Sequence, residues 1–217
     1  MISENARALL AEIPPGVELV AAVKGRRPAE VVEAIRAGIK VIGENYLQEA
    51  EKHHAVIGKD AKWHFIGSLQ QNKIKAVAAL FDMVETIDSD ESAKMLDRHC
   101  ARLRKEMPVL IEINSGREPQ KSGVMPEQAE SLITQVNRLP NIKIMGLMTM
   151  GPRFGSPEDS RKYFIATRKL FEQLKSWRIP NVKMNYLSMG MTNSYRIAIE
   201  EGANIIRIGT KIFGDVS

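Results

Sequence analysis

Residues 17–43 read VELVAAVKGRRPAEVVEAIRAGIKVIG, and this stretch decides the fold class. An apolar run over 17–23 predicts a β-strand, and a β-branched run over 39–43 predicts a second one. Between them, Pro28 falls in the first turn of a predicted helix and Gly38 comes just past its end. A strand, a helix and a strand in this order indicate two parallel strands joined by a crossover helix.

The same alternation continues to the end of the chain. It predicts eight strands, at residues 17–23, 39–43, 62–66, 83–87, 109–113, 142–148, 184–187 and 205–208. Eight parallel strands can form a closed (β/α)8 barrel or an open doubly wound sheet. We expect a single-domain barrel over residues 1–217, because no glycine-rich nucleotide fingerprint follows the first strand. A helix over 3–12 would help to close it.

Composition narrows the class of protein. With 44% hydrophobic and 26% charged residues, the chain has the balance of an ordinary soluble protein. No apolar run approaches the roughly 18 residues needed to cross a bilayer, and the start lacks the pattern of a signal peptide, so we expect a cytoplasmic protein. We also expect a monomer. The net charge of +5 is scattered among acidic residues, which argues against nucleic acid and favours a small anionic ligand.

Metal and thiol chemistry are not expected. His53 and His54 are adjacent on a predicted helix, so their side chains diverge by about 100° and cannot share a metal ion. Cys100 is the single cysteine, and His99 beside it points elsewhere on a helix. We interpret Cys100 as structural.

The functional groups of such a barrel stand at the carboxyl ends of its strands. Lys24 directly follows the first apolar strand, where partial desolvation would favour a neutral, nucleophilic amine. The alternative interpretation is a solvated lysine at a strand end.

Barrels commonly bind phosphate with the loops after the seventh and eighth strands. Ser188 and Gly190 lie in the first of these loops, and Gly209 and Thr210 lie in the second. Backbone amides and hydroxyls of this kind suit a phosphate, although ordinary turn chemistry is the alternative. Together with Lys24, they predict an amine and a phosphate cradle on one face of the barrel.

Five segments carry a resemblance to a known family. They are GENYLQE at 43–49, WHFIGSLQQNK at 63–73, KSG at 121–123, LSMGM at 187–191 and RIGTKIFG at 207–214. Through them, and over nearly its whole length, the chain resembles the YggS/PROSC family of pyridoxal phosphate homeostasis proteins.

The resemblance implies the fold of the N-terminal domain of alanine racemase, a fold type III protein for pyridoxal 5′-phosphate (PLP). Lys24 would form the internal aldimine with PLP, and Asn45 would line the pocket. The phosphate would be bound by Ser188, Gly209 and Thr210. Arg207 would face the pyridine nitrogen, where its permanent charge disfavours protonation of the ring and makes the cofactor a poor electron sink.

Two positions depart from the usual family pattern. Val23 stands where a serine or threonine commonly precedes the lysine, which removes a potential hydrogen bond. Ser194 stands where an aspartate is usual, which changes the charge near the phosphate. Both departures bear on the affinity for PLP.

The resemblance favours a protein that stores, buffers or delivers PLP, with PLP-dependent apoenzymes as recipients, rather than an enzyme. The alternative is a PLP-dependent amino-acid racemase of low activity. Racemisation needs a second base, which alanine racemase takes from a C-terminal domain of a partner subunit. The chain ends at Ser217, directly after the eighth predicted strand, so we expect no such domain. A regulatory module that docks on other proteins is a third possibility.

Overall fold

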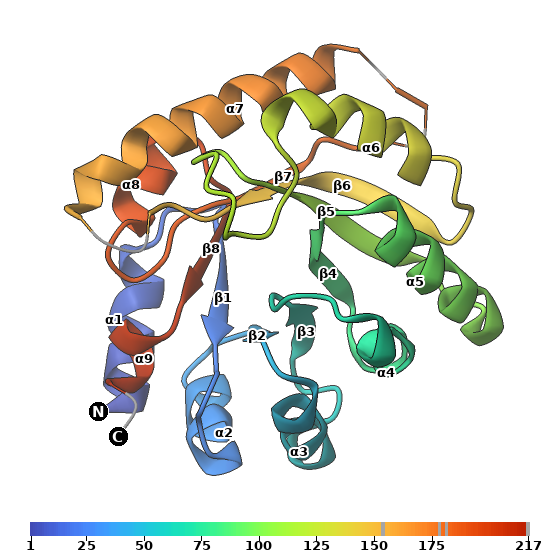
Figure 1. Ribbon diagram of the computed structural model, residues 1–217. Coiled ribbons are helices and arrows are strands. Elements are labelled where there is room, and N and C mark those ends of the chain that lie inside the picture. Colours follow the sequence, from blue (N-terminus) through green and yellow to red (C-terminus); the bar gives the residue numbers. More distant parts are fainter. Residues whose placement is uncertain (153–154, 178, 181, 216–217) are drawn as a thin grey trace.

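The computed structural model describes residues 1–152, 155–177, 179–180 and 182–215, and these residues form one closed barrel of eight parallel strands (Figure 1). Ser217, named above as the end of the domain, lies outside the described residues. The strands are β1 (Glu18–Ala22), β2 (Val41–Glu44), β3 (Lys62–Phe65), β4 (Met83–Ile87), β5 (Met107–Ile113), β6 (Ile142–Thr149), β7 (Tyr186–Ser188) and β8 (Ile205–Ile208). Each strand pairs with the next, and β8 pairs with β1 to close the ring. The barrel expected from the sequence is therefore confirmed.

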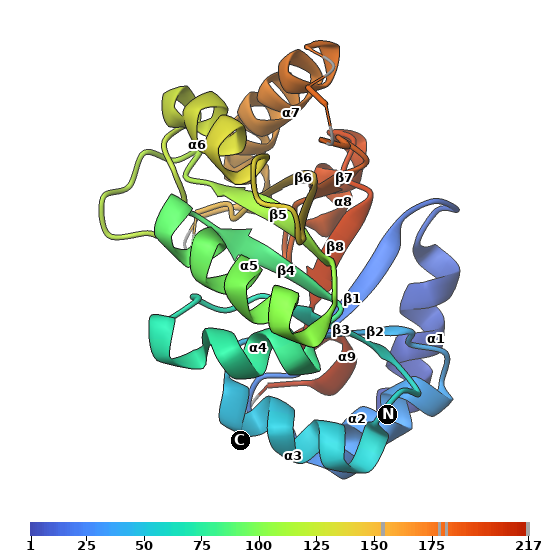
Figure 2. The same cartoon turned by 90° about the vertical axis from the view of Figure 1, so that its right-hand side faces the viewer.

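Helices surround the strands on the outside of the ring (Figures 1 and 2). In the described part of the chain they are α1 (Ile2–Glu12), α2 (Pro28–Arg36), α3 (Leu47–Ile57), α4 (Ile74–Leu80), α5 (Asp90–Leu103), α6 (Ala129–Val136), α7 (Arg161–Ser176), α8 (Tyr195–Glu200) and α9 (Thr210–Phe213). Short 3₁₀ turns η1 (Gln71–Lys73), η2 (Pro126–Gln128) and η3 (Pro157–Ser160) precede α4, α6 and α7. The first helix packs against α9, where the Asn5 amide donates to the carbonyl of Ile212 at 3.1 Å, and so supports the closure of the barrel as predicted.

The first crossover shows how local sequence sets the element bounds. Pro28 is the first residue of α2, where its missing N–H costs nothing. Gly38 follows the helix with φ +119°, a conformation that favours glycine. Because the amide of Ile39 still bonds to the carbonyl of Ala34 at 3.2 Å, the strand begins at Val41 and not at residue 39.

The other strand bounds agree with the sequence within two residues, and the shift in β7 matters most. This strand was predicted at 184–187 but runs over Tyr186–Ser188, in register with β6 through the pair Met148 and Ser188. Ser188 is therefore a strand residue, and its side chain points to the opposite face from that of Leu187. It lies inside the barrel instead of in the loop.

The interior of the barrel is apolar toward one end and polar toward the other. A separate cluster of interior side chains comprises Val20, Val41, Met83, Leu110, Met148 and Ile205. The larger core cluster lies between the strands and the surrounding helices. Two residues further along the strands, the interior positions hold Glu85, Glu112, Ser188 and Arg207, all of them buried.

Two features are absent from the described residues, a membrane span and a metal-binding cluster. Among the helices of this part of the chain, none combines the length and apolar character that a membrane span requires. The same residues place no group of three or more histidine, cysteine, aspartate or glutamate side chains where they could share a metal ion.

Candidate functional site

Lys24 lies two residues beyond the carboxyl end of β1, in a turn, and the strand period predicts a position on the side of the barrel axis. Val20, opposite Arg207 in the β1–β8 register, is an interior residue, and the period of two carries this face through Ala22 to Lys24. The ammonium group lies 5.2 Å from the ring centroid of Tyr46. Lys24 is exposed, so the protein alone does not provide the desolvation expected from the sequence.

Gly209 and Thr210 follow β8 and lie directly beside the end of β1. A Cβ atom on Gly209 would stand 3.0 Å from the carbonyl oxygen of Ala22, so the backbone here passes β1 too closely for a larger residue. The hydroxyl of Thr210 donates to the hydroxyl of Thr192 at 3.1 Å. The loops after β7 and β8 thus meet at the rim that carries Lys24.

Thr192 was not singled out from the sequence as a binding residue. The signal available was the polar character of the loop after the seventh strand, which contains several candidate hydroxyls. Sequence alone cannot tell which hydroxyl of such a loop turns toward the neighbouring strand. The structure selects Thr192 because its hydroxyl is the one paired with that of Thr210.

Ser188 takes a different position from the one predicted. It is fully buried, its hydroxyl donates to Oε2 of Glu85 at 2.6 Å, and it accepts from the Arg207 guanidinium. The single proton of this hydroxyl is therefore already used within the barrel. It lies in the β7 register, and not in the following loop as expected, while its role in binding phosphate stays a prediction.

Arg207 lies inside the barrel, below the rim. Its guanidinium donates to Ser188 and, at 2.9 Å, to the carbonyl oxygen of Thr149. It also lies 3.7 Å from Oε2 of Glu85, the nearest acidic group. The arginine predicted from the sequence is thus held rigidly under the mouth of the barrel.

Glu85 and His64 complete this buried group, and the sequence did not single out Glu85. Nδ1 of His64 lies 2.7 Å from Oε1 of Glu85. Burial by itself raises the pKa of Glu85, but the hydrogen bond and charge of His64, with the charge of Arg207 and the Ser188 hydroxyl, lower it overall. Glu85 is therefore a carboxylate and balances the charge of Arg207.

A second interior carboxyl, Glu112 on β5, behaves in the opposite way. Its burial raises the pKa to about 7, and the negative charge of Asp88 adds to the effect while Arg207 opposes it. Glu112 consequently exchanges its proton near neutral pH. This carboxyl lies in the same polar layer as Glu85 but outside the chain of hydrogen bonds from His64 to Arg207.

Asn45 and Glu44 follow one another at the end of β2, next to β1. The half-buried Asn45 amide donates to the carbonyl oxygen of Ile66 at 3.4 Å and ties the β2 and β3 ends together at the rim. Glu44 instead points toward α3, where Oε1 lies 2.5 Å from Nδ1 of His53. The Glu44 carboxyl group therefore faces α3 and not the mouth of the barrel.

The two departures from the family pattern have structural consequences. Val23 is fully buried in the core under the helices, on the opposite face of the strand from Lys24. Ser194 precedes α8, and its hydroxyl accepts from the amide of Met191 at 3.3 Å. Ser194 therefore provides a hydrogen-bond acceptor, as an aspartate would at this position, but it carries no negative charge.

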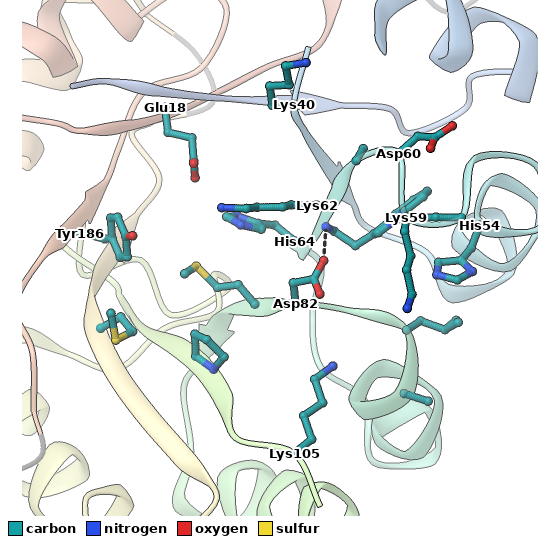
Figure 3. A pocket seen from close by; sticks show the side chains of 18 residues that line it. Glu18, Lys40, His54, Lys59, Asp60, Lys62, His64, Asp82, Lys105 and Tyr186 are labelled. Carbon is teal, nitrogen blue, oxygen red and sulfur yellow. Dashed lines mark hydrogen bonds between the residues drawn. The ribbon is translucent and has the colours of Figure 1, made fainter. Parts of the chain in front are cut away.

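A cavity with a volume of about 970 Å³ lies at the other end of the barrel (Figure 3). It is lined by residues at the amino ends of the strands, and the side chains of Glu18, Lys62 and His64 point into it. We call it the basal cavity. Its size does not make it the cofactor site, because the hydroxyl pair, the close glycine turn and the rim lysine all lie at the opposite end.

Comparison with known proteins places this geometry in a family. The family model for the N-terminal domain of alanine racemase matches residues 1–217. A pyridoxal phosphate homeostasis protein of Aquifex aeolicus is 40% identical over 199 residues, which cover 91% of this chain and 86% of the relative. This chain belongs to the family of pyridoxal phosphate homeostasis proteins. The corresponding protein of Vibrio cholerae is 35% identical and is covered to 91% of its length.

Solved structures agree with this family assignment. PipY of Synechococcus elongatus, solved with PLP bound, superposes with a TM-score of 0.90 at 30% identity, with 99% of this chain and all of PipY covered. Alanine racemase of Clostridium difficile gives a TM-score of 0.83 at 15% identity, and the match covers 56% of that enzyme. The racemase similarity shows a shared fold alone.

Proposed function

We propose that this protein binds PLP at the carboxyl ends of the strands and serves PLP homeostasis by storing, buffering or delivering the cofactor. The observation that carries the proposal is the closeness of the loops after β7 and β8 to the end of β1, through the Thr192–Thr210 pair and the Gly209–Ala22 approach. This arrangement brings an anion cradle to the end of β1, two residues before Lys24.

The residues present fit the chemistry of PLP. We assign the phosphate to the Thr192 and Thr210 hydroxyls and the backbone at Gly209, with Ser188 acting below them through Arg207. The amine of Lys24, which follows the neighbouring strand, would hold the aldehyde carbon of PLP covalently. Arg207 would interact with the ring nitrogen, and Asn45 would line the pocket.

Bound PLP supplies an aldehyde and an electron-withdrawing ring. The guanidinium of Arg207 is cationic, and beside the ring nitrogen of PLP it would disfavour protonation of that nitrogen and weaken the ring as an electron sink. Storage does not require a strong electron sink, whereas racemisation depends on one. The charge under the rim therefore favours a binding protein over an enzyme.

Relatives support the same conclusion. The Aquifex aeolicus and Vibrio cholerae proteins are named pyridoxal phosphate homeostasis proteins, and PipY was solved with PLP bound. Identities of 30–40% over nine-tenths of the chain make a shared ligand the simplest expectation.

Covalent labelling tests the proposal. The protein is loaded with PLP, reduced with borohydride and digested, and the modified lysine is identified by mass spectrometry. We expect the label on Lys24 and loss of the visible absorbance of bound PLP in Lys24→Ala. Lys62→Ala, which removes a lysine of the basal cavity, is the matched control and should keep both. A label on Lys62 with an unlabelled Lys24 would contradict the proposal.

A racemase of low activity is the second candidate, and the alanine racemase fold is the observation that favours it. Chiral chromatography of alanine and other amino acids incubated with the PLP-loaded protein decides between the two. Turnover of roughly 1 per second or more would establish an enzyme. We expect rates far below this value.

We further propose that the protein is a cytoplasmic monomer that passes PLP to PLP-dependent apoenzymes. Light scattering after size exclusion measures the mass directly, and 24.3 kDa is the value expected of one chain. Transfer is tested by mixing the loaded protein with an apoenzyme and following its activity. Activation no faster than by an equal amount of free PLP would show that the protein buffers PLP without delivering it.

A further inference from the structure

The interior of this barrel contains a buried polar group directly below the proposed PLP site. Barrels of this kind usually fill their interior with branched aliphatic side chains. Here the group comprises His64, Glu85, Ser188 and Arg207, each at most 4% exposed. Four polar side chains in such a place need a reason, because burying them without partners costs several kcal/mol.

These side chains form one continuous chain of hydrogen bonds across the barrel. His64 on β3 contacts Oε1 of Glu85 on β4 at 2.7 Å. The other carboxylate oxygen accepts from the Ser188 hydroxyl on β7 at 2.6 Å. Ser188 in turn accepts from the Arg207 guanidinium on β8. Four different strands thus fix one guanidinium.

Glu85 occupies the centre of this chain. Each of its oxygens has its own hydrogen-bond partner, and Oε2 also lies 3.7 Å from the guanidinium of Arg207. Since both oxygens are engaged, the carboxylate cannot rotate without losing a bond. Removing it would leave a buried cation without its nearest counter-charge.

We propose that Glu85 is a positioning residue that holds the orientation and the effective charge of Arg207 under the PLP ring, with Ser188 as the bridge and His64 as its support. This inference rests on the proposed function. Glu85 itself does not touch the cofactor. It acts by fixing the guanidinium, and thereby sets how strongly the positive charge acts on the ring nitrogen.

The visible spectrum of bound PLP distinguishes the two roles, because it would not change if Glu85 only stabilised the fold. Glu85→Gln keeps the size and one acceptor but removes the charge. We expect its PLP spectrum to change in wavelength or pH dependence and its dissociation constant for PLP to rise about tenfold, the effect of one lost charged hydrogen bond. Circular dichroism of the variant without PLP monitors the fold.

Two further variants make the test specific. Ser188→Ala removes the bridge while keeping the carboxylate, and should change the spectrum in the same direction by a smaller amount even if Glu85→Gln fails to fold. Glu112→Gln removes the neighbouring buried carboxyl outside the hydrogen-bond chain, and should keep the wild-type spectrum. Equal changes in Glu85→Gln and Glu112→Gln would show a general field effect and overturn the positioning role.

The outcome also separates this inference from the proposed function. Wild-type protein that fails to bind PLP would remove the proposed function itself. Wild-type protein that binds PLP, beside Glu85→Gln and Ser188→Ala variants with unchanged spectrum, pH dependence and affinity, would overturn the inference alone.

Discussion

The hydroxyl of Thr210 donates a hydrogen bond to the hydroxyl of Thr192 across 3.1 Å, and this contact joins the loop after β7 to the loop after β8. The Thr192 hydroxyl still has its own proton to donate, and the Thr210 proton is shared only with Thr192. An incoming phosphate can therefore accept a hydrogen bond from Thr192, or from both hydroxyls if their mutual bond breaks. The pair therefore holds two donors together before an anion arrives.

Thr210→Val should weaken PLP binding while the fold is kept. Valine has the shape of threonine without its hydroxyl, and a hydrogen bond to a charged group contributes about 1.5–3 kcal/mol. We expect the dissociation constant to rise roughly 10- to 100-fold, measured by titration of the visible absorbance of bound PLP.

The matched control is Thr134→Val, which removes an exposed threonine hydroxyl on α6. Its affinity for PLP should equal that of the wild type. If both valine variants bound PLP as tightly as the wild type, the assignment of the phosphate to this rim would be wrong.

Gly209→Ala should disturb the same cradle by steric means. The added methyl group would stand 3.0 Å from the carbonyl oxygen of Ala22, so the loop must move away from β1 by a few tenths of an ångström. We expect weaker PLP binding and a loss of about 1 kcal/mol in the free energy of unfolding. Gly116→Ala is the control, because its methyl group would meet the flexible side chain of Glu118. Unaltered PLP affinity in Gly209→Ala would show that the close approach has no part in binding.

Glu112 should make the stability of the PLP-free protein depend on pH. Its folded-state pKa of about 7 lies above the ordinary 4.5, so the neutral form stabilises the fold fully below about pH 4.5, and this stability is lost as the pH rises through 7. Glu112→Gln stays neutral throughout. As the pH rises through this interval, the free energy of unfolding of Glu112→Gln should increase by about 2–3 kcal/mol relative to that of the wild type. Urea unfolding at several pH values measures this difference.

Glu51→Gln, at an exposed position of α3, controls for the loss of a carboxyl group. Its stability should follow the wild-type pH curve in shape. Parallel curves for wild type and Glu112→Gln would mean that Glu112 is not buried in the way described.

Glu12 should have the reverse pH dependence at the outer surface. Hydrogen bonds from Arg196 and Tyr195, and to a lesser degree from Lys211, lower its pKa to about 2. A lowered pKa stabilises the fold above about pH 4.5, and this contribution disappears as the pH falls through 2. Because the site is partly exposed, Glu12→Gln should cost only about 1 kcal/mol at neutral pH.

Thermal unfolding at neutral and acidic pH measures this contribution. The melting temperature of Glu12→Gln should lie about 2–4 °C below the wild type at neutral pH. The gap should narrow in acid. A constant gap at both pH values would assign the loss to packing and not to the charge of Glu12.

The sequence by itself determined the class of the fold and the end of the barrel that carries the rim residues. Alternating strands and helices allow few arrangements, and the strand period of two together with Pro28 and Gly38 fixed most element bounds within a residue or two. Lys24, Gly209 and Thr210 could be placed at one rim because the carboxyl ends of parallel strands necessarily meet there.

Only the tertiary structure decided which polar groups contact each other. Because β7 ends one residue later than predicted, Ser188 lies inside the barrel and not in the following loop. The register of the strands places Glu85 beside Ser188 and Arg207. Sequence spacing does not encode these contacts, since residues 85 and 207 are far apart in the chain and meet only when the ring of strands closes. A buried charge is stable only when it is paired and hydrogen-bonded, and closure of the barrel determines which side chains lie close enough to pair with it.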